Sequence, residues 1–199
     1  MNEKLLIEEL QKHIEMVAKI GKQLGYNKVT DKSKWREPIM AGKLGHKAFF
    51  KISAGKNSDK YGADAIDLKT GKMAEYKSKA IEDKEIRNFL EKVKNKKTNK
   101  KYSPLVLSGV YNGAYTHEAI DRYENIDHYF GVFHDETCVL IIRPDQNEVI
   151  GQLRAEVNKR LAKGAKNKTT NLNTVKINLG DKHLYKVVWK NKEWYNNNA

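Results

Sequence analysis

Two carboxylates and a lysine lie within one short stretch of the sequence, Gly62 to Ile81, at a spacing that suits metal-dependent chemistry. Asp64 opens a short alternating run, residues 69–72 carry a turn signal, and Glu75 and Lys77 follow in an expected return strand. Alternating runs on either side of a Gly-containing turn predict a β-hairpin.

The hairpin is expected to gather these charged side chains on one face. With Thr70-Gly71 as the two loop residues, Ile66 would pair with Glu75, and Asp64 would pair with Lys77. Side chains alternate along a strand and paired residues share a face, so all four would project to the same side of the sheet.

Two carboxylates and a lysine on one face suit the hydrolysis of a phosphodiester. The carboxylates of Asp64 and Glu75 would be hard oxygen ligands for a divalent cation such as Mg²⁺. Such an ion activates water and neutralises charge on a phosphate oxygen. Lys77 beside it would position or activate the attacking water and stabilise developing negative charge.

The same residues resemble a known nuclease family. The run Gly62-Ala-Asp-Ala-Ile-Asp, followed by Glu75-Tyr-Lys-Ser, is similar to the active-site motif of PD-(D/E)XK nucleases, and among them of type II restriction endonucleases. The motif takes the first letter of its name from a proline that precedes the aspartate, and this chain has Ala63 at that position. The resemblance implies a homodimer that cleaves double-stranded DNA with Mg²⁺ and leaves 5′-phosphate ends. In that reading Asp64 and Glu75 are metal ligands, and Lys77 completes the catalytic set.

Other interpretations of the hairpin stay open. Glu-x-Lys recurs at Glu82-Asp83-Lys84, and a charged hairpin can simply hold an Asp64–Lys77 cross-strand pair. Within the nuclease class, a structure-selective enzyme such as a junction resolvase is the alternative, because fold does not fix function. A non-catalytic, basic nucleic-acid-binding protein is the alternative from another class.

Composition favours a polyanionic partner. The 199 residues carry a formal net charge of +13, and lysine and arginine displace counterions from phosphates. Cys138 is the only cysteine, so neither an internal disulfide nor a cysteine metal site is expected. The N-terminus lacks the apolar core of a signal peptide, no run reaches membrane-spanning length, and residues 54–62 lack a phosphate-binding P-loop pattern. These features predict a cytoplasmic protein without a nucleotide cofactor.

Three further groups of residues are candidates for the site. Lys56-Asn57 lie in a polar loop before the hairpin and would face DNA, and so would Tyr115, Thr116 and His117, which match a DNA-contacting run of the resembling enzymes. Thr116 as a helix cap followed by a solvent-facing histidine is the alternative for that run. Glu37 would be either an additional acidic ligand or an exposed carboxylate in the first turn of a helix that starts near Pro38.

The expected fold is an α/β domain of the α+β type, in which a mixed sheet forms a restriction-endonuclease-like PD-(D/E)XK core with flanking helices. One domain would span residues 1–199, with an N-terminal helix in 1–25, a catalytic core in 46–144 and a C-terminal helix and strands in 145–199. Besides the hairpin, helices are expected at 3–24, 82–95, 116–124 and 148–163, and strands at 47–53, 104–111, 127–133, 137–143, 174–179 and 183–189.

Two parts of this expectation concern the ends of the chain. Apolar residues recur at helical spacing in 3–24, and this helix would either pack on the core or, as the resemblance implies, form a dimer interface. The last two strands are expected to be joined around Gly180-Asp181, and the tail from Trp194 to Ala199 is expected to be frayed.

Overall fold

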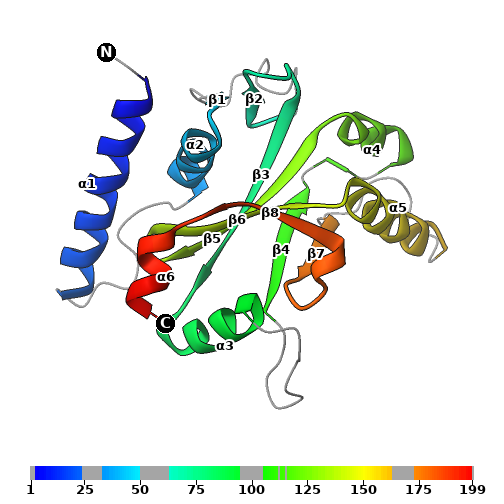
Figure 1. Cartoon of the computed structure of the whole chain (residues 1–199). Coiled ribbons are helices and arrows are strands. Elements are labelled where there is room, and N and C mark those ends of the chain that lie inside the picture. Colours follow the sequence, from blue (N-terminus) through cyan, green and yellow to red (C-terminus); the bar gives the residue numbers. More distant parts are fainter. Residues whose placement is uncertain are drawn as a thin grey trace.

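The computed structural model describes residues 3–23, 33–49, 63–94, 105–111, 113–114, 116–162 and 173–198 (Figure 1). Its helices are α1 (Glu3–Gln23), α2 (Ser33–Leu44), α3 (Asp83–Lys94), α4 (His117–Glu124), α5 (Gln146–Ala162) and α6 (Lys192–Asn198), with a short 3-10 helix at Lys182–Leu184. Its strands are β1 (His46–Ala48), β2 (Ala65–Asp67), β3 (Met73–Ile81), β4 (Val106–Tyr111), β5 (Asp127–His134), β6 (Thr137–Pro144), β7 (Asn173–Asn178) and β8 (Tyr185–Lys190).

A six-stranded mixed sheet forms the centre of the fold, in the order β1-β2-β3-β5-β6-β8. Only β3 and β5 run parallel, with Glu75 opposite His128 and Lys77 opposite Phe130, while the other neighbours are antiparallel. The expectation of a mixed α/β fold with a mixed sheet is therefore confirmed.

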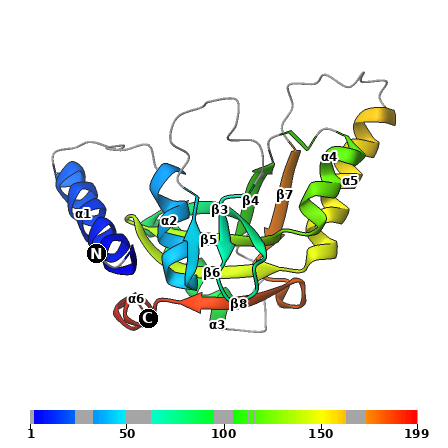
Figure 2. The same cartoon turned by 90° about the horizontal axis from the view of Figure 1, so that it is seen from above.

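Helices and a second small sheet cover the two faces of this sheet. On one face, α3, α4, α5, α6 and the β4–β7 pair enclose the larger core cluster, which includes Phe130, Leu140 and Ile142. On the other face, α2 packs against Ala74 and Tyr76 of β3. Figure 2 shows α1 as the outermost helix, with α2 between it and the sheet. None of the helices in the described ranges is long and apolar enough to cross a membrane.

Helix α2 begins earlier than the sequence suggested. It starts at Ser33, so Pro38 is the sixth residue of the helix and lies inside it, not in the first turn. Arg36 anchors the helix, because its guanidinium donates a hydrogen bond of 2.8 Å to the buried carboxylate of Glu136 in the β5–β6 turn. Asp135 and Glu136 form that two-residue turn with positive φ angles, a conformation typical of a tight hairpin.

The last two expected strands are both present and are joined around Gly180-Asp181, but they do not pair with each other. β7 pairs with β4 in the separate two-stranded sheet, whereas β8 pairs with β6 at the edge of the central sheet. The turn at Gly180-Asp181 and the 3-10 helix after it redirect the chain from one sheet to the other. β1 (His46–Ala48) overlaps the beginning of the strand expected at 47–53. Residues 50–62 lie outside the described part of the chain.

The expectation of a frayed tail is wrong. Residues Lys192–Asn198 form α6, in which Trp194 and Tyr195 are buried. Both rings pack against Phe89 of α3, with ring centroids 5.9 Å and 5.8 Å away. The C-terminal segment is thus part of the larger core. The free energy gained by burying two large aromatic side chains exceeds the contribution of the chain entropy that fraying would release.

Candidate active site

The turn of the β2–β3 hairpin is set by the side chain of Asp67. Its carboxylate accepts hydrogen bonds from the Lys69 N–H (2.8 Å) and the Thr70 hydroxyl (2.7 Å), and Gly71 has a positive φ of 71°. The loop therefore has four residues, and Ile66 pairs with Met73. The predicted two-residue loop, which paired Ile66 with Glu75, is wrong.

This register places Asp64 beside Glu75 instead of opposite Lys77. The Asp64 N–H donates to the Ala74 carbonyl (2.8 Å), and the Asp64 carboxylate accepts from the Tyr76 N–H (2.8 Å). The two bonds bracket Glu75. Asp64 and Glu75 are 3% and 6% exposed, so two carboxylates lie together in a nearly buried position. The observed strand pairing is shifted by two residues from the predicted one, and a shift of two keeps each side chain on its predicted face of the sheet. Asp64, Glu75 and Lys77 therefore still lie on one face, as expected.

Lys77 completes the group. Its ammonium donates to the Glu75 carboxylate over 2.5 Å, and the two side chains are 17% and 8% exposed. The second Glu-x-Lys of the sequence has a very different environment: the Glu82 and Lys84 side chains also form an ion pair, but they are 68% and 78% exposed. Burial thus separates the hairpin pair from a solvated surface pair of the same spacing.

Strand β4 holds Lys77 from the side. The Lys77 ammonium lies 4.8 Å from the ring centroid of Tyr111, a cation–π contact. Gly109, two residues earlier on β4, faces the aliphatic part of the lysine, and a Cβ at this position would lie only 2.5 Å from Lys77 Cγ. The lysine is therefore confined between its carboxylate, an aromatic face and a backbone without a side chain.

Tyr111 is fixed in turn by a buried histidine. His128 Nε2 lies 3.1 Å from the carbonyl oxygen of Tyr123, which only accepts, so Nε2 carries the proton and Nδ1 accepts from the Tyr111 hydroxyl over 3.0 Å. Burial lowers the pKa of His128 to about 4. Burial, and then the charge of Glu75, raises the pKa of Tyr111 well above its usual value. Both groups are neutral at ordinary pH and form a support for Lys77.

The other predicted site residues are not gathered at this position. Glu37 lies on α2, which covers the opposite face of the sheet from Glu75 and Lys77. Lys56, Asn57 and Tyr115 lie outside the described residues.

Thr116 and His117 have structural contacts of their own. The Thr116 hydroxyl caps α4 by accepting from the Ala119 N–H over 3.1 Å, as expected for the cap alternative. His117 Nε2 donates to Asn158 Oδ1 (2.9 Å), and its Nδ1 accepts from Arg154 (3.3 Å). The histidine therefore connects α4 to α5, and a role of either residue in binding DNA stays a prediction.

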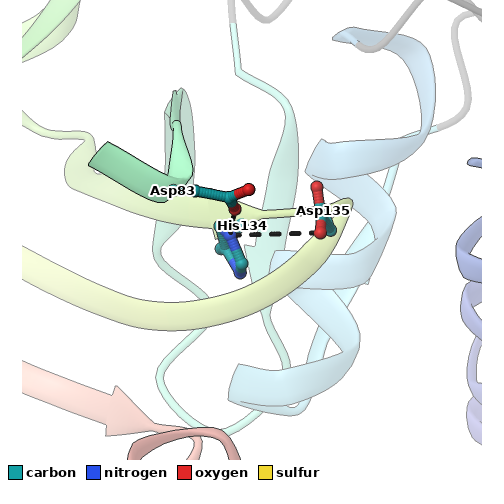
Figure 3. Close-up of side chains that lie close together, drawn as sticks. All are labelled: Asp83, His134 and Asp135. Carbon is teal, nitrogen blue, oxygen red and sulfur yellow. Dashed lines mark hydrogen bonds and ion pairs between the residues drawn. The ribbon is translucent and has the colours of Figure 1, made fainter. Parts of the chain in front are cut away.

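A second group of possible metal ligands lies at the far end of β5. Asp83, His134 and Asp135 could hold a metal ion, because their ligand atoms lie within 4.8 Å of one another (Figure 3). However, the Trp194 indole donates to His134 Nδ1 over 3.1 Å, so the ring proton is on Nε2, which donates to Asp83 over 2.8 Å. A metal-bound histidine almost always donates a hydrogen bond from the ring nitrogen that does not bind the metal. Here that nitrogen, Nδ1, accepts a hydrogen bond instead. The cluster is the weaker candidate for a metal site.

A surface depression of about 480 Å³ lies where β6 ends and β8 begins. It contains no residue of the hairpin, and its rim carries more cations than carboxylates, so it does not suit a divalent cation. Its lining consists of Arg143, Pro144, Asp145, Gln146, Lys182, His183, Tyr185 and Lys186.

The sequence interpretation missed the residues that support Lys77. Gly109 and Tyr111 lie two residues apart on β4, and His128 is the second residue of β5, so each of them belongs to a strand that was predicted. What brings them to the hairpin is the position of β4 beside β3 and the parallel pairing of β3 with β5, and both are long-range contacts. The signal that the sequence offered was a tyrosine and a histidine, Tyr111 and His128, at expected strand positions.

Comparison with known proteins gives no further guide to this site: no protein-family model matches the chain, and no curated protein sequence matches it.

Proposed function

We propose that the chain is a magnesium-dependent deoxyribonuclease with a PD-(D/E)XK active site on the β2–β3 hairpin. One observation carries the proposal: Asp64, Glu75 and Lys77 lie together, nearly buried, and Lys77 is bonded to Glu75. An ordinary surface ion pair between Lys77 and Glu75 would require neither the burial of these side chains nor the second carboxylate, that of Asp64.

The donor set fits Mg²⁺. Magnesium is usually held by one or two carboxylates together with water and substrate phosphate, and Asp64 and Glu75 would supply those carboxylates. Two adjacent carboxylates repel each other, and a divalent cation relieves this repulsion. When bound, the ion would supply Lewis-acid polarisation of a phosphate oxygen and would lower the pKa of coordinated water.

Lys77 would orient the attacking water and stabilise negative charge that develops on the phosphate. Its contacts with Gly109 and Tyr111 fix the direction of the ammonium before the substrate arrives. His128 has both ring nitrogens engaged and is neutral, so it is not the base of this scheme.

The substrate that suits this site is DNA, and the net charge of +13 favours it. The most specific version is a type II restriction endonuclease, a homodimer that cuts both strands of a defined sequence and leaves 5′-phosphate ends. Its support is the resemblance around Gly62 to Ser78. A two-fold dimer matches a palindromic site.

Incubation with unmethylated plasmid and phage DNA, with Mg²⁺ or with EDTA, tests the proposal. Wild type is expected to produce discrete fragments with 5′-phosphate ends only with Mg²⁺. Lys77→Ala should cut about 10²–10⁴-fold more slowly. Lys84→Ala is the matched control, because it removes the lysine of the exposed Glu-x-Lys pair and should cut like wild type.

Two other outcomes would redirect the proposal. Cutting of branched DNA alone would identify a structure-selective nuclease on the same site. Salt-sensitive binding without cleavage of any of these DNAs, unchanged in Asp64→Ala, would contradict a nuclease and support a non-catalytic binding protein.

A further inference from the structure

The surface depression between the end of β6 and the start of β8 carries an excess of basic side chains. We call this depression of about 480 Å³ the β6–β8 pocket. Arg143, Lys182 and Lys186 line it together with His183, whereas Asp145 is the one carboxylate among its lining residues. Such an excess of cationic groups suits an anion.

Two of the basic side chains lie directly opposite each other in the sheet. Arg143 of β6 and Lys186 of β8 are partners in the antiparallel register, so both side chains project to the same face. Like charges in directly opposed positions destabilise a sheet. Arg143 donates to Asp127 over 2.7 Å, but within the described part of the chain the Lys186 ammonium has neither a hydrogen bond nor an ion pair. An anion held between Arg143 and Lys186 would remove their repulsion.

The carboxylate of the pocket is engaged at the start of a helix. Asp145 accepts hydrogen bonds from the Asn147 N–H (2.9 Å) and the Glu148 N–H (3.4 Å), and thereby caps α5. Figure 2 shows this end of α5 beside the loop that leads into β8. Asp145 forms no ion pair with Arg143 or Lys186, so the charge of these two side chains is left for a ligand.

The walls of the pocket leave room for more than a bare ion. Its volume falls within the range of about 300–1,000 Å³ that is typical of small-molecule sites. Pro144 is buried and Tyr185 is half-buried, and the Tyr185 hydroxyl donates to the Leu179 carbonyl over 2.8 Å, which fixes the ring. An aromatic ring beside basic side chains is an arrangement that proteins use to bind the base and the phosphate of a nucleotide.

We propose that the β6–β8 pocket binds a phosphate group of a nucleotide between Arg143 and Lys186. The planar guanidinium of Arg143 matches two phosphate oxygens, and Lys186 adds a point charge. Lys182 and His183 complete the basic wall, and Tyr185 offers an apolar surface to the sugar or the base. This phosphate site shares no residue with the proposed metal site.

The pocket lies at the same end of the sheet as the candidate active site. Arg143 is bonded to Asp127, which pairs with Ala74, the residue before Glu75. Three strand spacings separate β3 from β8, a distance of about 14 Å. This distance equals about four base pairs along a duplex. The phosphate belongs either to a DNA strand that extends from the candidate site, a version that rests on the proposed function, or to a free nucleotide.

Binding of a short fluorescent DNA duplex in EDTA, at several salt concentrations, tests the DNA source without cleavage. Lys186→Ala should weaken binding of all sequences alike and should lower the slope of log Kd against log salt concentration by about 0.9, because one phosphate contact is lost. Lys84→Ala is the matched control, since it removes an exposed lysine with the same charge, and its slope should equal that of wild type.

Thermal denaturation with adenosine monophosphate, beside adenosine, tests the free nucleotide. A ligand that binds only the folded chain raises Tm. Adenosine lacks the phosphate, so for a free-nucleotide site adenosine monophosphate should raise the Tm of wild type and of Lys84→Ala, and adenosine should not. In Lys186→Ala the effect of adenosine monophosphate should be lost.

The two measurements together decide the proposal. A lower salt slope in Lys186→Ala alone supports the pocket and assigns the phosphate to DNA. An unchanged slope, with a Tm increase that needs both the phosphate and Lys186, supports the pocket and assigns the phosphate to a free nucleotide. Lys186→Ala that matches wild type, or matches Lys84→Ala, in both measurements would overturn the proposal.

Failure of the pocket and failure of the nuclease are distinguishable. Duplex binding that depends on Lys186, in a protein that cuts none of the DNAs with Mg²⁺, would contradict only the nuclease. Cleavage by a protein whose nucleotide and duplex binding do not depend on Lys186 would contradict only the pocket.

Discussion

Lys77 gains its position partly from residues on β4 that carry no chemistry themselves. An ammonium on four methylenes has many rotamers, and a catalytic role needs one of them. The Glu75 carboxylate, the face of Tyr111 and the bare backbone of Gly109 together leave little other space for this side chain. Residues on β4 thus matter to the proposed reaction as positioning residues.

Gly109→Ala tests this positioning. The added Cβ would lie 2.5 Å from Lys77 Cγ and 2.9 Å from Phe130 Cε1, so the lysine must move. A displacement of about 1 Å at a catalytic group can cost about 10²-fold in rate, and we expect a loss of this order in single-turnover cleavage. Overpacking should also lower the free energy of unfolding by about 1–3 kcal/mol, measured by urea denaturation.

Gly151→Ala is the control for that experiment. Gly151 lies on α5, and a Cβ there meets nothing within 4 Å. This variant should cut DNA at the wild-type rate and should be slightly more stable, because alanine favours helix. Equal cleavage rates for Gly109→Ala and wild type would show that β4 does not position Lys77.

The buried His128 predicts a dependence of stability on pH. Its pKa is about 4 in the folded chain, whereas the ordinary pKa of a histidine is 6.5, so between these values the unfolded chain binds a proton that the folded chain does not. Stability from this residue is complete above pH 6.5 and falls as the pH falls toward 4, by roughly 3 kcal/mol in total.

His128→Gln isolates this contribution. A glutamine amide can still donate to the Tyr123 carbonyl and accept from Tyr111, but it does not titrate. In urea denaturation at several pH values, the variant should lose less stability than wild type between pH 6.5 and 4, by roughly 3 kcal/mol. Parallel pH profiles for the two proteins would contradict the assignment.

At the scale of residues, the sequence predicted on which face of the sheet a side chain lies better than it predicted which residues that side chain contacts. Alternation along a strand is local, so Asp64, Glu75 and Lys77 could be placed on one face from the sequence. The register depended on the side chain of Asp67, which closes a four-residue loop where the Thr-Gly pair suggested a two-residue one. Gly109 could not be linked to Lys77, because no local signal reports which strands become neighbours.

At the scale of elements, α6 shows how a short terminal helix joins a core. Trp194 stacks edge-on against Phe89 and also donates to His134 Nδ1. We expect Trp194→Ala to lower the free energy of unfolding by about 3–5 kcal/mol, as for other buried tryptophans. Asn196→Ala, on the exposed side of the same helix, should change it by less than about 0.5 kcal/mol. Similar losses for both variants in thermal or urea denaturation would contradict a core role for α6.

Helices with strong apolar periodicity were predictable, whereas strand partners were not. The expected helices at 82–95, 116–124 and 148–163 correspond to α3, α4 and α5, because a 3.6-residue period is a local property. The sequence predicted β7, β8 and the turn at Gly180-Asp181 between them, but that turn signal is the same whether the two strands pair or separate. Local chemistry specifies that the chain turns, and packing specifies where it goes next.

At the scale of the whole molecule, the parallel pairing of β3 with β5 builds the candidate site. The two strands are separated in the sequence by α3, β4 and α4, and these same elements return to cover the face that carries Lys77. The mixed sheet could be expected from composition and pattern. The strand order and the separate β4–β7 sheet could not, because both depend on contacts between distant segments.

Cleavage of DNA by Asp64→Asn, beside Asp83→Asn, tests the central claim most directly. The two variants make the same change in the two groups that could hold a metal, the hairpin pair and the Asp83–His134–Asp135 cluster. In single-turnover cleavage with saturating Mg²⁺, Asp64→Asn should lose at least about 10³-fold in rate, because it would remove a ligand of the proposed catalytic cation. Asp83→Asn should retain the wild-type rate. Wild-type cleavage by Asp64→Asn, or loss of cleavage only in Asp83→Asn, would contradict the hairpin as the active site.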